Sequence, residues 1–202
     1  MREKRTPLRQ RQAEATRSLI VEAARQLFLE GGYTSTTIEA IADRAGVAVS
    51  TVYAIFSSKR GILRLIREEW HRQTHIQDFL AEDQTELEPA TRLENLAVAT
   101  RWQWQLGAEV IAIYRSAAAA DREAAAELAE ALAGRRKGLD TFTWSLAVHV
   151  RPGLDVPRAC AILRALCQVE LYEELVARSG WTAQAYQNWL AAALKRELLE
   201  DS

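Results

Sequence analysis

The sequence predicts an all-α protein of about nine helices, and three observations lead to that prediction. Apolar residues recur at helical spacing from Leu19 onward. Beyond Pro89 every apolar pattern has the helical period, and none alternates as a half-buried strand would. Runs of alanine, a strong helix former, fill much of the same region. We therefore expect helices packed on helices throughout.

Composition places the chain among water-soluble globular proteins. Of its 202 residues 49% are apolar and 26% charged, which suits one or two domains with a sizeable core. The longest run without a charged residue, Ser179 to Leu194, is shorter than the ~20 residues of a membrane span. No apolar block follows the basic N-terminus, and Cys160 and Cys167 favour buried, reduced thiols. We expect a cytoplasmic protein without membrane contact.

The first segment, Met1 to Ala13, is polar, basic and contains Pro7. It is predicted to be a flexible arm, and either a solubilising tail or a contact with nucleic-acid phosphates fits its composition. Arg17 to Glu30 has a clear amphipathic pattern and predicts a helix that ends at the following glycine pair.

The next segment predicts two short helices separated by Gly46. The first opens at Thr36 or Thr37, and Thr36 with Glu39 has the spacing of a capping box. Gly46 suits a left-handed helix end. Two such helices joined by a tight turn form a helix-turn-helix, whose second helix enters the major groove of DNA. Two packed core helices are the plainer alternative.

The second helix of the pair decides between these alternatives. Val47, Val52 and Ile55 are expected to face inward, whereas the opposite side carries groups able to contact phosphates or base edges. A Lys and an Arg then open the following helix, where the N-terminus already attracts anions. This arrangement favours DNA binding over a core role.

The spacing of these residues closely resembles the DNA-binding region of the TetR family of bacterial transcriptional regulators. The matched residues are Thr36-Thr37, Ile41-Ala42, Ala45-Gly46-Val47, Thr51-Val52-Tyr53, Phe56 and Ser58-Lys59. Ala48 stands where the family often has a capping Ser, and Ile55 where it often has an aromatic residue or His. The resemblance implies that double-stranded operator DNA is bound by a homodimer. It assigns the DNA contacts to Thr36, Thr37, Val49, Ser50, Thr51, Tyr53, Ala54 and Lys59.

The charge distribution agrees with a DNA-binding N-terminal module. Residues 1–60 hold ten basic and six acidic residues, a net charge of +4, which leaves 16 basic and 21 acidic residues, a net of −5, for the rest. We predict a DNA-binding domain over residues 1–57 and an effector-binding and dimerisation domain over residues 58–202. The body is expected to form helices over residues 58–80, 89–106, 108–119, 122–149, 156–178 and 182–199.

The body is rich in aromatic residues, most of which should be ordinary core. By the family plan, some of them line a pocket for a small apolar or aromatic effector. The candidates are Trp70, Trp102, Trp104, Tyr114, Trp144 and Glu170, the last either a buried acid that orients the ligand or a surface or interface carboxylate. Apolar stripes on the last two helices predict a dimer interface through Leu163, Leu166, Tyr186, Trp189, Leu190, Ala193 and Leu194.

No pattern of catalytic or metal-binding residues appears, so neither an enzyme, a cofactor nor a metal is expected. His71 and His75 are four apart but lack further ligands at suitable spacing. The interpretation we adopt is a repressor released from DNA by a small molecule. A helix-turn-helix regulator controlled by a protein partner is the main alternative, and a helical-bundle enzyme is the least favoured.

Overall fold

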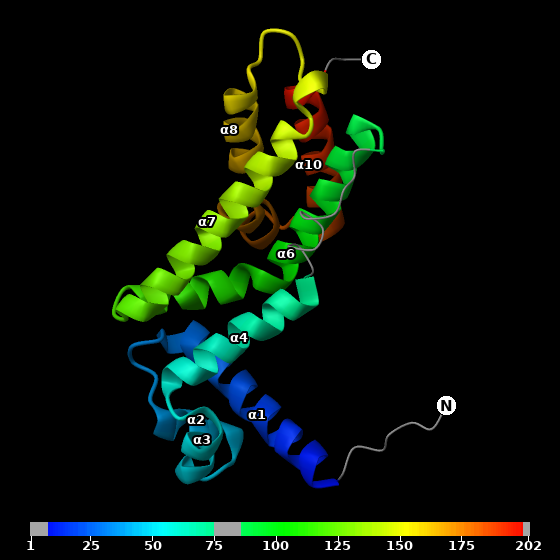
Figure 1. Cartoon of the computed structure of the whole chain (residues 1–202). Coiled ribbons are helices and arrows are strands. Elements are labelled where there is room, and N and C mark those ends of the chain that lie inside the picture. The colour runs from blue at the N-terminus through cyan, green and yellow to red at the C-terminus, as the bar shows by residue number, and fades with distance from the viewer. Residues whose placement is uncertain (1–7, 75–85, 200–202) are drawn as a thin grey trace. The chain divides into compact units, whose positions relative to one another are not determined.

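A computed structural model describes residues 8–74 and 86–199, and within these ranges the regular structure is entirely helical (Figure 1). The all-α prediction is confirmed. The predicted helix end at residues 75–80 and residues 1–7 of the arm lie outside the described residues. The helices are α1 (Leu8–Gly31), α2 (Ile38–Ala45), α3 (Val49–Phe56), α4 (Lys59–Thr74), α6 (Pro89–Ala118), α7 (Arg122–Trp144), α8 (Val156–Leu166), α9 (Val169–Tyr172) and α10 (Ala183–Leu198), with a 3₁₀ turn at Ala147–His149 and a π-helix at Glu173–Arg178.

The chain divides into two compact units. The first comprises Met1–Trp70 and Glu109–Leu128, and the second His71–Ala108 and Ala129–Ser202. The predicted boundary after residue 57 therefore differs from the observed division, since the first unit also contains most of α4, the end of α6 and the start of α7. Helices α4, α6 and α7 each have residues in both units.

The first unit is built on α1, against which α2 packs, with α3 packed on α2 (Figure 1). Ile20, Ala24 and Phe28 supply the buried stripe of α1, as the periodicity predicts. The helix begins at Leu8, however, so residues 8–13 are helical and the prediction of a flexible arm is wrong for them.

Three glycines lie inside the long helices of the body, and none of them interrupts its helix. Helix α6 continues from Pro89 to Ala118 through Gly107, where two helices were predicted. Helix α7 likewise runs through Gly134 and Gly138. A single glycine costs only about 1 kcal/mol in a helix, so packing along a long helix overrides it.

The predicted helix over residues 156–178 is interrupted at Cys167. Its carbonyl oxygen accepts hydrogen bonds from Trp104 Nε1 at 3.1 Å and from Arg135 at 2.9 Å. A carbonyl engaged by side chains from other helices does not accept the next helical bond, so α8 ends there and a new turn starts at Val169. The break thus comes from tertiary contacts and not from a local breaker residue.

In the second unit α8 packs against α10, and this contact buries most of the predicted dimer residues inside one chain. Five of the seven residues are buried, whereas Leu166 and Trp189 are half-buried. The prediction is therefore wrong for those five, because the apolar stripes of the two helices cover each other. The five are Leu163, Tyr186, Leu190, Ala193 and Leu194.

Candidate nucleic-acid interface

The loop before α2 separates the roles of two adjacent threonines. Thr37 is the N-cap of α2, and its hydroxyl accepts a hydrogen bond from Ala40 N at 3.2 Å. Thr36 is buried, and its hydroxyl bonds the carbonyl oxygen of Gly32 at 2.9 Å. The predicted capping role of Thr36 and its hydroxyl contact with DNA are both wrong, since this side chain instead fixes the loop that positions α2.

Helix α3 has one buried and one outward face. Val52 is fully buried and Phe56 is 8% exposed, so these two residues anchor the helix on the unit. Ser50, Tyr53 and Ala54 are exposed, and Val49 and Thr51 are half-exposed. Ile55, expected to face inward, is 38% exposed. Its position extends the outward face, because it lies four residues beyond Thr51 on the helix.

The ends of α2 and α3 follow the expected backbone chemistry. Gly46 has φ 67° and caps α2 in the left-handed region, as predicted. Ala48 is the N-cap of α3 and makes no side-chain hydrogen bond, since it has no oxygen to offer. The first N–H groups of α3 therefore depend on other partners, which makes the helix start receptive to an anion.

Lys59 was predicted to clamp a DNA phosphate, but its ammonium group is engaged within the protein. It donates hydrogen bonds to Tyr33 O at 2.6 Å and Thr36 O at 2.8 Å and lies 4.3 Å from the Tyr33 ring centroid. Burial lowers the pKa of the Lys59 amine. Lys59 therefore ties the first turn of α4 to the loop before α2.

A tight junction joins α3 to α4. Ser57 ends α3 with φ 59°, a left-handed conformation unusual for a residue other than glycine. A Cβ atom at Gly61 would lie 2.2 Å from the carbonyl oxygen of Phe56, so only glycine fits there. The two helices consequently pack backbone against backbone at this point.

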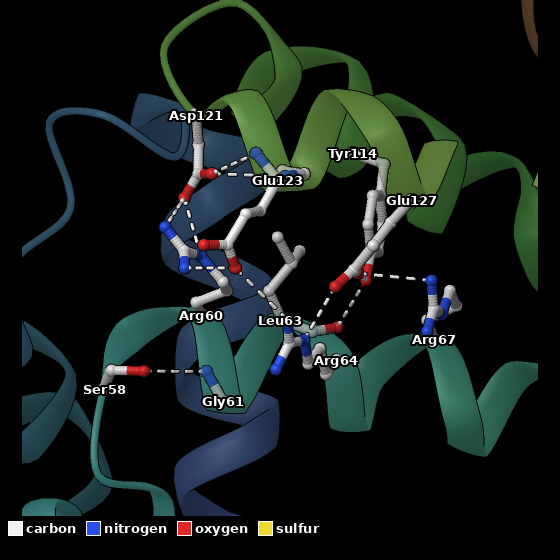
Figure 2. A network of polar contacts seen from close by, with 11 residues as sticks. Ser58, Arg60, Gly61, Leu63, Arg64, Arg67, Tyr114, Asp121, Glu123 and Glu127 are labelled. Carbon is white, nitrogen blue, oxygen red and sulfur yellow. Dashed lines mark hydrogen bonds and ion pairs between the residues drawn. The ribbon is translucent and has the colours of Figure 1, made fainter. Parts of the chain in front are cut away.

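Three arginines on one side of α4 form an ion-pair cluster with acidic residues of α7 and its cap (Figure 2). Arg60 pairs with Asp121 at 3.0 Å, and Arg64 with Glu127 at 2.7 Å. Arg67 reaches the same Glu127 carboxylate at 3.2 Å. The arginine spacing of four and three residues places them on one helical face. We call these residues, together with Glu123, the α4–α7 ion-pair cluster.

Half-buried Glu127 and buried Tyr114 extend this cluster below the surface. Although burial alone would raise the pKa of Glu127, hydrogen bonds from Arg64 and Tyr114 lower it overall. The Tyr114 hydroxyl donates to Glu127 at 3.0 Å, and burial raises the pKa of that phenol. Asp121 also accepts hydrogen bonds from the N–H groups of Glu123 and Ala124, so it caps the first turn of α7.

The six predicted pocket residues do not form one apolar lining. Trp70 and Tyr114 are buried in the first unit, and Trp104 in the second. Trp102 and Trp144 are 44% and 58% exposed. Glu170 is also exposed, which agrees with the surface carboxylate and not with the buried acid. The described ranges contain no group of three or more His, Cys, Asp or Glu residues that could hold a metal.

Comparison with known proteins identifies the helix-turn-helix. The family model for bacterial regulatory proteins of the tetR family matches residues 20–66, which include α2, α3 and the capping residues described above. Residues 20–66 therefore resemble the DNA-binding region of the TetR family. Two curated relatives, both of Pseudomonas putida, agree over 81 residues, 39% of this chain: the probable HTH-type transcriptional regulator ArpR at 36% identity, and the HTH-type transcriptional regulator TtgR at 35%. The chain spans 37% of each relative's length.

Solved structures extend the TetR fold to nearly the whole chain. NalD, the secondary repressor of the MexAB-OprM multidrug efflux pump in Pseudomonas aeruginosa, has a TM-score of 0.69 at 21% identity, over 95% of this chain and all of that one. A tetR-family protein from Rhodococcus RHA1 gives 0.71 at 18%, over 92% of this chain and 98% of that one. A complex of SmeT with triclosan gives 0.70 at 22%, over 93% of both chains.

The arginines of the α4–α7 ion-pair cluster were not among the site residues predicted from the sequence. Their spacing in α4, matched by Glu123 and Glu127 four apart in α7, was a readable signal of two facing charged stripes. Arg135 was not predicted as a site residue either. In the part of the chain that the structure describes, no helix is long and apolar enough to cross a membrane.

Proposed function

We propose that this protein is a dimeric transcriptional repressor that inserts α3 into the major groove of its operator and is released by a small molecule. The observation that carries the proposal is the outward face of α3, exposed at Ser50, Tyr53 and Ala54 on a helix anchored by buried Val52 and Phe56. The second helix of a helix-turn-helix contacts base edges through such a face. The family match at residues 20–66 supports the same role.

Sequence readout by this face relies on small and hydroxyl-bearing side chains. Helix α3 contains no Arg, Lys, Asn or Gln, so bidentate recognition of guanine or adenine is not available from it. We expect Val49 and Ala54 to contact thymine methyl groups, with DNA shape adding to specificity. Thr37 and Tyr53 supply hydroxyls for phosphates, whereas Lys59 does not, because its ammonium is already bonded.

The experiment is operator selection from a random DNA library with the wild-type protein and Ser50→Arg. A new guanidinium on the outward face should move the preferred base at one position in each half-site toward guanine. Gln12→Arg is the matched control, since it adds the same charge at an exposed position of α1. An unchanged preference in Ser50→Arg would assign base readout to another surface.

Release by a small molecule is proposed to act through the helices shared by the two units. The α4–α7 ion-pair cluster joins α4 to α7 within the first unit, and both helices continue into the second. A ligand shifts the protein from mostly bound to mostly released only if it prefers the released form by roughly 10⁴-fold, about 5.5 kcal/mol. The pump repressor NalD and the triclosan complex of SmeT support a ligand-responsive repressor.

Dimerisation is proposed to use the outer faces of α8 and α10, since their inner faces cover each other. Ala161 and Ala165 on α8 and Ala192 on α10 are exposed and small. Close approach of two such helix pairs would form a four-helix interface like that implied by the family resemblance. A two-fold dimer would present its α3 helices to major grooves about 34–36 Å apart.

A further inference from the structure

Arg135 on α7 is held in the second unit by neutral partners. Its guanidinium donates hydrogen bonds to the side-chain oxygen of Gln103 and, at 2.9 Å, to the carbonyl oxygen of Cys167. The same group lies 4.6 Å from the ring centroid of Trp104. Although the residue as a whole is half-buried, protein encloses its charged end, and this burial lowers the pKa of the guanidinium.

No carboxylate among residues 8–74 and 86–199 pairs with Arg135, in contrast to Arg60, Arg64 and Arg67. An arginine stays protonated at neutral pH, so its charge is retained inside the unit. A buried cation is costly to the fold unless an anion offsets it. The end of α8 offers only the partial negative charge of a helix C-terminus.

A second buried polar group of this unit, on α10, has no hydrogen-bond partner within the described residues. Tyr186 is fully buried, and its hydroxyl has no hydrogen-bond partner in the described structure. Burial raises the pKa of this phenol, and the positive charge of Arg135 acts in the opposite direction. The Tyr172 ring meets the Tyr186 ring edge-on at 5.0 Å. The second unit therefore holds an unpaired donor against one aromatic ring and a cation without a carboxylate partner against another.

We propose that Arg135 anchors the carboxylate of a flat aromatic acid, and that this class of molecule is the effector. The inference rests on the proposed function and adds a carboxylate to the small apolar or aromatic effector expected from the sequence. A carboxylate would accept hydrogen bonds from the guanidinium and from the Tyr186 hydroxyl, and would supply the missing negative charge. Trp104 and Tyr172 would flank the ring of the ligand.

A capping role for Arg135 at Cys167 is the competing explanation. The Cys167 carbonyl already accepts a hydrogen bond from Trp104 Nε1, so it is satisfied without Arg135. A cap also leaves the Tyr186 hydroxyl unexplained. The two explanations differ in a measurable way, since only an anion site distinguishes an acid from its neutral amide.

The experiment measures binding of benzoate, 2-naphthoate and 9-anthroate, each compared with its primary amide, by calorimetry and Trp fluorescence. The wild-type protein should bind at least one acid about 10–100-fold more tightly than its amide, as expected for charged hydrogen bonds. Arg135→Gln should remove this preference and leave amide binding unchanged, while Arg135→Lys should keep part of it. Arg136→Gln, at the exposed neighbouring position, is the matched control and should behave as wild type.

Tyr186→Phe provides a second test that does not depend on the folding of the Arg135 variants. Removing an unpartnered hydroxyl should leave the melting temperature unchanged or higher, and should weaken acid binding several-fold. The proposal is overturned if no acid binds better than its amide, or if the preference survives in Arg135→Gln. Anisotropy of labelled operator DNA, measured with the same acids, separates this result from the proposed function. An acid that binds through Arg135 without releasing the DNA contradicts the proposed release of the repressor by a small molecule. An acid that releases DNA equally from wild type and from Arg135→Gln contradicts only the Arg135 site.

Discussion

Replacing Lys59 by alanine should destabilise the first unit, and should not act mainly by weakening DNA binding. The substitution removes two hydrogen bonds from a charged donor, to Tyr33 O and Thr36 O, and a contact with the Tyr33 ring. Hydrogen bonds of this kind contribute about 1.5–3 kcal/mol each. Lys59 is half-buried, so water regains part of each carbonyl and the lower end of that range applies. We expect a loss of about 2–3 kcal/mol in the free energy of unfolding.

Thermal and urea unfolding monitored by circular dichroism measure this loss. At roughly 2–4 °C per kcal/mol for a chain of this size, the melting temperature should fall by about 4–12 °C. Lys137→Ala is the matched control, because it removes an exposed lysine from α7 and should change the stability by less than about 0.5 kcal/mol. Operator affinity is then compared at a temperature where every variant is fully folded.

The salt dependence of operator binding distinguishes the two roles of Lys59. A phosphate contact, as the family resemblance implied, would lower the slope of log K against log[salt] by about one per half-site. If Lys59→Ala has the melting temperature of the wild type and shows that reduced slope on every DNA sequence, the structural assignment of the ammonium group is wrong. If the folded variant keeps the wild-type slope, Lys59 acts by holding the loop before α2.

Two further substitutions test other parts of the chain. Leu190→Arg buries an unpaired charge at a position with 0% exposure, so it should cost at least about 3 kcal/mol of stability and unfold the second unit. Ala192→Arg changes an exposed position, so it should give folded monomers by light scattering. A folded Leu190→Arg monomer would contradict the burial of Leu190 within its own chain. Because the pKa of Glu127 lies below its ordinary 4.5, its stabilising contribution is present above that pH and is lost as the pH falls through the folded-state value. The free energy of unfolding of Glu127→Gln should therefore fall less steeply below pH 4.5 than that of the wild type. If the two proteins lose stability with pH at the same rate, Glu127 does not contribute to acid unfolding.

The helix-turn-helix was predictable because its signals are local. Gly46 supplies the left-handed cap, and the spacing from Ala45 to Phe56 identified the turn and the second helix without tertiary information. Thr36 and Lys59 were assigned to DNA because family motifs record which residue types occur and not where each side chain points. In the structure both side chains bond the carbonyl groups of the loop before α2.

The body was less predictable because contacts distant in sequence decide its helix ends. Nothing in residues 156–178 marks Cys167 as a breaking point, since the hydrogen bonds that end α8 come from Trp104 and Arg135. The apolar stripes of α8 and α10 were correctly identified, but periodicity cannot tell an intramolecular partner from a second chain. Leu190 is buried by its own chain for this reason.

The junction at Ser57 and Gly61 has a consequence for the time course of operator binding. Only two residues separate α3 from α4, and Gly61 lies against the carbonyl of Phe56, so bending there would force backbone atoms together. The helix that enters the groove therefore has no slow reorientation of its own. Mixing excess protein with labelled operator in a stopped-flow instrument should give a single exponential whose rate rises in proportion to protein concentration, without a lag or a plateau.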